Sequence, residues 1–276
     1  MVARAARLCY ASEKGKRSTE DFCQALIERG HLSMFRHASH YFVIDVPNEN
    51  SRVPVWLPKV LIDSAFVECV YYKVKHKGRI YFASTNGQVL MENERMAALL
   101  APYEVTVSEF VTKANELHFS TALMCIRYTV CVTTQISTSR ELNRTSPNNI
   151  AEQSTRYVNF GRRGGITICT PHWFGYAHWT KKLLARIAWK LAEWEYCIAL
   201  HLGLPPQDAR EFLPLSTATR VVYTYLAFEW RHIFALRLTG TTGKPHPNAQ
   251  IAAQHIHDAI LPLHRIHAGH NASLIS

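Results

Sequence analysis

A stripe of large apolar side chains is the sequence feature that most constrains the fold. Between residues 174 and 202, apolar residues recur at three- and four-residue steps, with lysines and arginines among the positions between them. The stripe consists of Trp179, Leu183, Leu184, Ile187, Leu191, Trp194 and Ile198. This period predicts one long amphipathic helix. Packing against the core or against another subunit is the favoured role of the stripe, ahead of a cofactor site.

The other hydrophobic patterns predict a mixed α/β chain, of the α+β class. Alternating or β-rich runs predict strands at residues 40–46, 66–75, 79–83, 123–133 and 219–226, and residues 76–78 make a hairpin between the second and third. Helical patterns cover residues 18–29, 86–101, 135–144, 174–202, 228–238 and 249–266. The first of these helices begins at Ser18, a capping residue, and Gly30 follows its end.

Residues 140–157 form a polar segment with almost no apolar side chains. Three arginines (Arg140, Arg144, Arg156), two glutamates (Glu141, Glu152) and several hydroxyl or amide side chains occupy it, and Pro147 should end the preceding helix. Guanidinium groups and hydroxyls can hold phosphate oxygens, and carboxylates can accept hydrogen bonds from sugar hydroxyls. An anion-binding loop is one interpretation, and a solvated loop with ordinary surface charges is the other.

The spacing in this segment resembles a known signature. Arg-Glu-Leu-x-Arg, followed after seven residues by Glu-x-Ser-x-Arg-Tyr, is similar to the motif of the flavin-dependent thymidylate synthases, the ThyX family. Residues 4–10, 30–37, 209–220 and 230–237 resemble further family segments in the same order. The chain departs from the family pattern at four positions, Thr145, Ser146, Leu226 and Phe228. The residues that the family usually has at these positions contact the flavin more than the nucleotide.

The resemblance implies a fold and an assembly. A ThyX-like domain has an antiparallel sheet flanked by helices, and residues 1–276 are expected to form one such domain. Residues 47–124 have no counterpart in compact family members and are interpreted as an inserted α/β segment. The family assembles as a homotetramer whose chains share the active sites, so a homotetramer is expected here too.

The resemblance also implies a reaction, the methylation of carbon 5 of a uracil nucleotide, UMP or dUMP. FAD is the implied cofactor, and methylenetetrahydrofolate and NADPH are the implied cosubstrates. This chain combines recognisable ThyX segments with an altered signature motif and an insertion. In this combination it is similar to a uracil 5-methylase of nucleoside-antibiotic biosynthesis. The alternatives are an ordinary thymidylate synthase acting on dUMP, a flavin-dependent hydroxymethylase, and a non-catalytic basic nucleic-acid-binding protein.

Candidate site residues follow from the resemblance, position by position. Those implied around the nucleotide are Glu141, Arg144, Glu152, Gln153, Ser154, Thr155, Arg156, Arg210 and Arg237. Those implied at the flavin are His31, Ser33, Arg144, Thr145, Ser146, Glu152 and His232. Tyr157 and Leu236 are candidates for lining the sugar, by their positions beside two of these arginines.

Arg237 is the candidate catalytic residue. A guanidinium beside the pyrimidine edge favours the enolate-like form of the ring, which makes carbon 5 nucleophilic without a covalent enzyme adduct. Neither Cys125 nor Cys131 has the nearby base motif that an activated thiol needs. The alternative role for Arg210 and Arg237 is an ion pair or a helix cap.

Composition supports these expectations. The net charge of +10 suits polyanionic small ligands, whereas the sequence shows no nucleic-acid-binding motif, so no nucleic-acid partner is expected. Seven dispersed cysteines without a C-x-x-C pair are typical of reduced thiols. No run approaches the roughly 18–20 apolar residues of a membrane span, and a cytoplasmic location is expected. Five histidines near the C-terminus (His255, His257, His264, His267, His270) are interpreted as solvated helix residues, and no metal site is expected.

Overall fold

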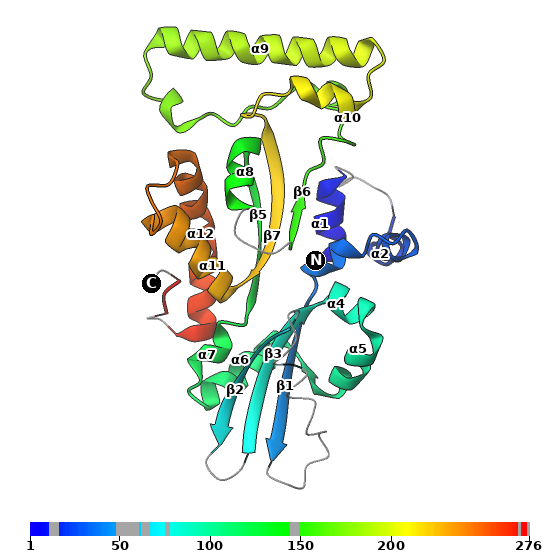
Figure 1. Cartoon of the computed structure of the whole chain (residues 1–276), viewed down its shortest axis with the longest axis vertical. Coiled ribbons are helices and arrows are strands. Elements are labelled where there is room, and N and C mark those ends of the chain that lie inside the picture. The colour runs from blue at the N-terminus through cyan, green and yellow to red at the C-terminus, as the bar shows by residue number, and fades with distance from the viewer. Residues whose placement is uncertain are drawn as a thin grey trace.

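The computed structural model describes residues 1–10, 17–47, 61, 67–74, 78–143, 149–269 and 272–274. Its elements form two antiparallel sheets flanked by helices, which confirms the predicted fold class (Figure 1). The strands are β1 Ser39–Pro47, β2 Glu68–Val74, β3 Gly78–Asn86, β4 Glu104–Val105, β5 Arg127–Gln135, β6 Ile150–Glu152 and β7 Ala218–Leu226.

The helices vary from single turns to two elements of more than twenty residues. The α-helices are α1 Val2–Cys9, α2 Thr19–Glu28, α4 Gly87–Glu92, α5 Glu94–Leu100, α6 Val107–Glu116, α7 Ser120–Leu123, α8 Ile136–Leu142, α9 Trp179–His201, α10 Pro206–Ala209, α11 Ala227–Phe234 and α12 Pro247–Ala268. The 3-10 turns are η1 Leu32–His37, η2 Ala101–Tyr103, η3 Gly161–Arg163, η4 His172–Phe174 and η5 Arg210–Phe212, and η6 Ala235–Thr239 is a π-helical turn. None of the described helices combines the length and apolar character that crossing a bilayer needs.

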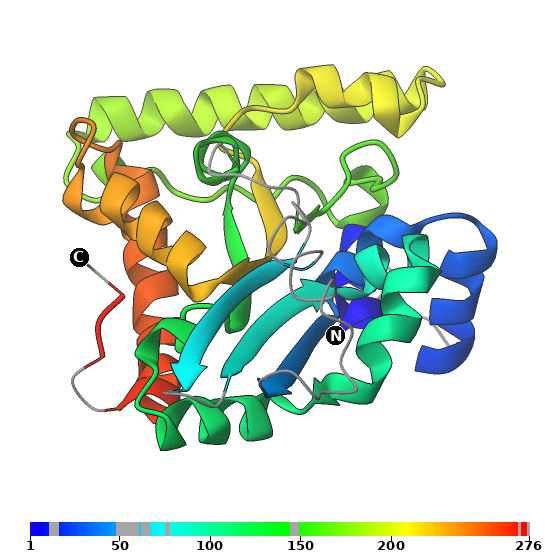
Figure 2. The same cartoon turned by 60° about the horizontal axis from the view of Figure 1, so that its bottom comes forward.

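The first sheet has the strand order β2-β3-β1-β4. The predicted hairpin is confirmed, since β2 pairs antiparallel with β3, although its turn at 75–77 lies outside the described residues. Phe82 of β3 packs edge-on against Phe110 of α6, with ring centroids 5.2 Å apart. Both belong to the same core cluster as Tyr223 and Trp230. The segment predicted as an insertion therefore shares the main core, and Figure 2 shows its sheet beside α6.

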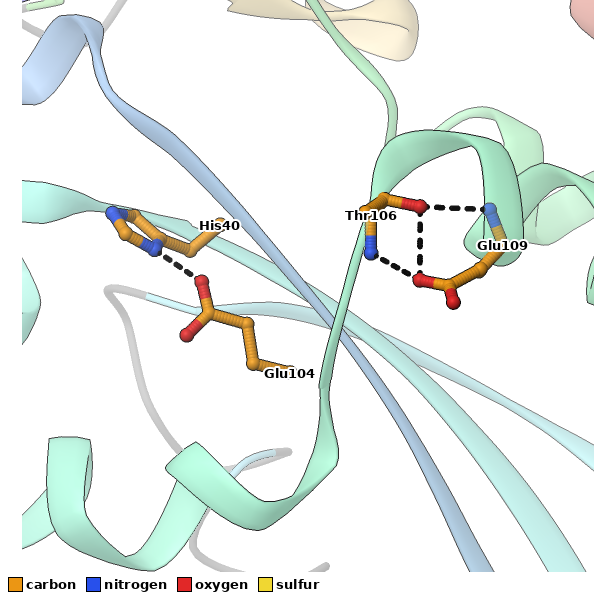
Figure 3. Close-up of polar contacts among 4 residues, drawn as sticks. All are labelled: His40, Glu104, Thr106 and Glu109. Carbon is orange, nitrogen blue, oxygen red and sulfur yellow. Dashed lines mark hydrogen bonds and ion pairs between the residues drawn. The ribbon is translucent and has the colours of Figure 1, made fainter.

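Polar contacts fix the chain where it leaves this sheet for α6 (Figure 3). His40 Nδ1 of β1 lies 2.7 Å from Glu104 Oε1 of β4. Two residues later, Thr106 Oγ1 accepts a hydrogen bond from the Glu109 backbone N–H at 3.2 Å, and Glu109 Oε2 accepts from the Thr106 backbone N–H at 2.8 Å. This reciprocal capping box starts α6 because it satisfies two backbone donors that the helix leaves without partners.

The second sheet has the order β5-β7-β6 and carries the candidate site. β5 pairs with β7 over its whole length, from Arg127 opposite Leu226 to Gln135 opposite Ala218. α12 packs against β5, whereas α1 packs against β6 and β7 (Figure 1). α8 follows β5 directly, so the polar segment after α8 begins at one end of this sheet.

Most long elements match their predictions. Ser18 Oγ accepts from the Asp21 backbone N–H at 3.0 Å, and Gly30 takes the left-handed conformation with φ of 69°, so the predicted limits of α2 are confirmed. The predicted helix at 86–101 is instead two helices that meet at Asn93. Asn93 Nδ2 donates to Val89 O at 2.8 Å, the carbonyl that the Asn93 backbone N–H would bind in a continuous helix.

Two predicted starts were too early. The strand predicted from residue 123 begins at Arg127, because residues 120–126 close short turns such as Cys125 N–H to Ala122 O. The helix predicted from residue 174 begins at Trp179, after a 3-10 turn at His172–Phe174. Helical periodicity marks the apolar face of an element better than its ends.

The interpretation of the C-terminal histidines as solvated is wrong for His257 and His264, which are buried in α12. Tyr128 Oη lies 3.1 Å from Nδ1 of both His264 and His267. Burial lowers the pKa of His264 to about 4. These side chains join α12 to β5, while His255 is exposed and His270 lies outside the described residues.

Candidate functional site

A cavity of about 590 Å³ lies where α8 begins and β6 ends. It is lined by Ile136, Arg140, Glu152, Gln153, Ser154, Thr155, Arg156, Arg210, Glu211, Leu213 and Leu215. Six of the predicted nucleotide-binding residues, at 152–156 and 210, therefore lie around one cavity. The antiparallel pairing of β6 with β7 produces this arrangement, because it places the end of β6 beside the start of β7.

Backbone hydrogen bonds fix the wall at residues 152–156. The Gln153 N–H donates to Arg220 O of β7 at 2.8 Å, and the Ser154 N–H donates to Cys9 O of α1 at 3.0 Å. Ser154 Oγ then accepts from the Arg156 backbone N–H at 3.2 Å. The wall is thus tied to a strand on one side and to a helix on the other, as a preorganised binding surface requires.

Arg210 reaches the cavity from a separate part of the chain. It begins η5, directly after α10, and the Leu213 N–H donates to Arg210 O at 3.0 Å. Ala209, the preceding residue, is fully buried in a cluster with Val158 and Tyr196. This anchor fixes the turn while the guanidinium of Arg210 stays exposed.

Three arginines line the cavity: Arg140, Arg156 and Arg210. Among the described residues, none of them forms an ion pair with a carboxylate. Arg156 instead lies over the ring of Tyr157, with its guanidinium carbon 5.5 Å from the centroid. The sequence analysis did not include Arg140 among the nucleotide-binding residues, although its position in the polar segment 140–157 could have indicated that role. Guanidinium groups without an ion pair can donate charge-assisted hydrogen bonds to phosphate oxygens.

Glu152 is held by a set of donors that the sequence analysis missed. Ser139 Oγ donates to Glu152 Oε1 at 2.8 Å, and Thr219 Oγ1 donates to the same oxygen at 3.0 Å. Asn143 Nδ2 lies 3.4 Å from Glu152 Oε2, and Tyr223 Oη donates to Asn143 Oδ1 at 2.9 Å. These contacts fix the carboxylate in one orientation and leave Oε2 with capacity to accept from a ligand hydroxyl.

Arg237 does not line this cavity. It extends from the π-helical turn η6, and its Nη2 donates to Glu141 O, near the C-terminus of α8, at 2.8 Å. This is the helix-capping role named above as the alternative. Its Nε is buried and has no hydrogen-bond partner among the described residues, so the guanidinium retains a donor.

The predicted flavin residues come from several elements, and of these Glu152 lines the cavity. His31 and Ser33, at the start of η1, are exposed, and His31 Nδ1 lies 3.1 Å from Tyr10 Oη. The Tyr10 ring also contacts Tyr157, which is 63 % exposed. His232 is exposed on α11. Arg144, Thr145 and Ser146 lie outside the described residues.

The cysteine thiols lie away from this cavity. No cysteine lines it, and burial raises the pKa of the Cys9 thiol to about 12 and that of the Cys125 thiol still further. All seven cysteines are unpaired thiols. Within the described ranges, no group of three or more His, Cys, Asp or Glu side chains could hold a metal ion.

The family model named thymidylate synthase complementing protein matches residues 73–265, which is more than half of the chain. The chain belongs to this family, as its resemblance to the ThyX motifs predicted. Membership also confirms the predicted enzyme class, a thymidylate-synthase-like methylating enzyme. The match begins inside the segment 47–124, whose status as an insertion stays a prediction.

Among solved structures, 97 chains match this one. The UMP/dUMP methylase PolB from Streptomyces cacaoi bound with 5-Br dUMP is 22 % identical over 55 % of this chain and 74 % of that chain, with a TM-score of 0.43. The same methylase bound with 5-Br UMP is 20 % identical over 60 % and 82 % of the two chains, also with a TM-score of 0.43. No curated protein matches the chain.

Proposed function

We propose that this protein methylates carbon 5 of uracil nucleotides, UMP and also dUMP, with FAD as cofactor. The observation that supports this proposal is the cavity that gathers residues 152–156 with Arg210. Its arginines suit a phosphate, and its fixed glutamate suits a sugar hydroxyl. A role in nucleoside-antibiotic biosynthesis in the cytoplasm belongs to the same proposal.

Each part of the nucleotide has a counterpart among the residues of the chain. Arg156 and Arg210 are proposed to bind the phosphate, with Arg140 as a third cation, and Glu152 is proposed to accept from the ribose. Arg237 is proposed to hold the uracil edge through its buried Nε donor, which has no hydrogen-bond partner among the described residues. An N–H donor aimed at the ring oxygen stabilises the enolate-like form from which carbon 5 reacts.

The described residues fit one part of a flavin site. His31 and Ser33 offer polar groups, and the adjacent rings of Tyr10 and Tyr157, tilted by 54° to each other, offer aromatic faces. When bound, FAD supplies hydride chemistry that NADPH renews, and methylenetetrahydrofolate supplies the carbon. His232 and Arg237, which lie on α11 and η6, are proposed to join this surface from another chain.

A homotetramer is therefore part of the proposal. Most of the α9 stripe is exposed in the single chain, for example Leu184 at 70 % and Trp194 at 63 %, whereas Tyr196 and Ala199 are buried near its end. The long helix spans the top of the molecule (Figure 1). An apolar face of this extent is typical of a contact between subunits, and this supports packing against another chain for most of the stripe.

The experiment that tests the function is product analysis with UMP and dUMP in parallel. Purified protein is incubated with each nucleotide, methylenetetrahydrofolate and NADPH, and the products are identified by mass spectrometry. A mass gain of one CH2 unit, from replacement of the hydrogen on carbon 5 by a methyl group, is expected on both nucleotides, together with the absorption spectrum of bound flavin. Turnover of dUMP while UMP neither reacts nor inhibits would instead identify an ordinary thymidylate synthase.

A further inference from the structure

A second cavity, of about 390 Å³, lies along β5 where α12 packs against this strand. Residues 130–135 of β5 line one side of it and α12 lines the other, and residues 169, 170 and 172 lie near Gln135. It shares no lining residue with the proposed nucleotide cavity. The two cavities contact different faces of α8, because Thr138 lines this one whereas Ile136 and Arg140 line the other.

The wall that α12 contributes is largely apolar. Asn248, Ala252, Ile256 and Ala259 recur along it at steps of three and four residues, so they form one stripe of the helix. No aspartate, glutamate, lysine or arginine is among the lining residues, all of which the structure describes. An ionised ligand would lose its hydration there without gaining a charged partner, so the cavity favours a neutral molecule.

Three polar side chains at one end of this cavity form a hydrogen-bonded network. The His172 backbone N–H donates to Asn248 Oδ1 at 2.8 Å, which fixes this oxygen as an acceptor. Asn248 Nδ2 donates to Gln135 Oε1 at 2.8 Å, and Gln135 Nε2 donates to Cys169 O at 2.7 Å. Gln135 is only 6 % exposed, so these contacts hold both amide groups in one orientation.

This network retains hydrogen-bonding capacity that a ligand could use. His172 Nδ1 lies 3.1 Å from Asn248 Oδ1. Because that oxygen accepts, Nδ1 carries the proton in the neutral ring and Nε2 is an acceptor. Each amide nitrogen also has a second hydrogen, for which the described residues supply no partner. The cavity therefore offers donors on Gln135 and Asn248 and an acceptor on His172.

We propose that the cavity between β5 and α12 binds a neutral heterocycle with a ring amide, in which a carbonyl lies beside an N–H. The carbonyl would accept from Asn248 or Gln135, and the ring N–H would donate to His172 Nε2. The ring faces would lie against Ile256 and the rest of the apolar stripe. The volume suits a compound of one or two rings. This site depends on neither nucleotide nor flavin binding.

Two compounds of the same shape test the proposal. The probe is isoquinolin-1-one, a neutral bicyclic ring amide, and its control is isocoumarin, which keeps the carbonyl but has a ring oxygen in place of the N–H. The whole protein is saturated with FAD and UMP, and equilibrium dialysis measures the binding of each compound. One isoquinolin-1-one per chain should bind, about tenfold or more tighter than isocoumarin, because a ring oxygen cannot donate to His172 Nε2.

Two results of the dialysis would overturn the proposal. One is that isoquinolin-1-one does not bind up to the limit of its solubility. The other is that UMP or FAD displaces it, which would place the probe in the nucleotide or flavin site.

A histidine variant tests the contact itself. His172→Phe keeps a ring but removes the acceptor, so it should weaken isoquinolin-1-one about tenfold while isocoumarin changes little. The preference between the two compounds should therefore disappear, whereas a mere distortion of the cavity would weaken both equally. His201→Phe, which changes an exposed histidine at the end of α9, is the matched control and should keep the preference. A preference that persists in His172→Phe would contradict the proposed contact.

Crystals of the wild-type protein cover the case in which His172→Phe fails to fold. Soaked with the 4-bromo derivative of the probe, they should show the anomalous signal of bromine between β5 and α12. A signal only elsewhere on the molecule, or none although dialysis finds binding, would overturn the proposal. None of these results would bear on methylation of the nucleotide, which is measured separately.

Discussion

Three guanidinium groups around one cavity concentrate positive charge on a small volume of the proposed nucleotide site. Arg140, Arg156 and Arg210 come from three different local structures, the helix α8, the loop after β6 and the turn η5. Because the structure pairs none of the three with a carboxylate among its described residues, each retains donors for a ligand. A phosphate dianion is the ligand that such a set binds most strongly.

Replacing these arginines should weaken nucleotide binding more than turnover. Arg156→Ala and Arg210→Ala each remove charge-assisted hydrogen bonds worth about 1.5–3 kcal/mol, so KM for the nucleotide should rise about 10- to 100-fold. The phosphate does not change during the reaction, so kcat should fall much less. Steady-state kinetics check this, with Arg95→Ala as the control. Equal losses of kcat with unchanged KM would contradict a phosphate-binding role.

The hydroxyl groups that donate to Glu152 should affect nucleotide binding only while residue 152 carries a carboxylate. Ser139→Ala and Thr219→Val each remove one hydrogen bond to Glu152 Oε1, and KM for the nucleotide should rise about 3- to 30-fold. In a Glu152→Gln background the same changes should add little, because the carboxylate that they orient is gone. A double-mutant cycle measures this coupling. Additive effects would show that Ser139 and Thr219 act on packing alone.

Arg237 has two testable roles, a cap on α8 and a donor to the uracil ring. The cap is worth about 0.3–1 kcal/mol of stability. If the donor role also holds, Arg237→Ala should lower kcat about 100-fold or more while the midpoint of thermal unfolding changes by only a few degrees. Arg237→Lys keeps the positive charge but loses the planar guanidinium with its several N–H donors, so it should restore stability more than turnover. A purely structural Arg237 would lose stability and keep kcat.

At the scale of elements, apolar periodicity predicted the long helices and both sheets' main strands, because burial of one face decides those structures. It missed the break at Asn93, where a side chain takes the carbonyl of the helix. Residues 152–156 were predicted together because they are contiguous in one motif. Thr219 was missed because β7 brings it to Glu152 across 67 residues of sequence, a pairing that no local pattern contains.

The packing of α12 on β5 should make stability depend on pH. His264 and His37 are buried with their pKa lowered to about 4, whereas in the unfolded chain both would have values near 6.5. Below pH 6.5 the unfolded chain gains protons that the folded chain does not. The free energy of unfolding should therefore fall between pH 6.5 and 4, by on the order of 1–3 kcal/mol per histidine.

Urea denaturation from pH 7.5 to 4.5 measures this dependence. His264→Gln should reduce the stability at neutral pH but flatten the slope, because one buried titrating group is gone. His255→Gln, an exposed position on the same helix, should leave the slope unchanged. An identical slope in the His264 variant would show that α12 does not hold a neutral histidine against Tyr128.

At the scale of the whole molecule, the exposed stripe of α9 should hold subunits together. Burying a leucine contributes about 1.5–3 kcal/mol, and a carboxylate in its place must lose its hydration on assembly. Leu184→Glu and Trp194→Glu should therefore raise the dissociation constant of the assembly more than about tenfold, while Lys181→Glu, a polar position of the same helix, should not. Sedimentation equilibrium checks this over a range of concentrations.

The same variants connect assembly with catalysis. In the proposed shared site, His232 and Arg237 of one chain act with His31 and Ser33 of another, so the complete site requires at least two chains. The specific activity of Leu184→Glu should therefore rise with protein concentration and reach the wild-type value only where the assembly reforms. Full activity in a dissociated, folded single chain would contradict the shared site, and a wild-type protein that is already monomeric would contradict the role of α9.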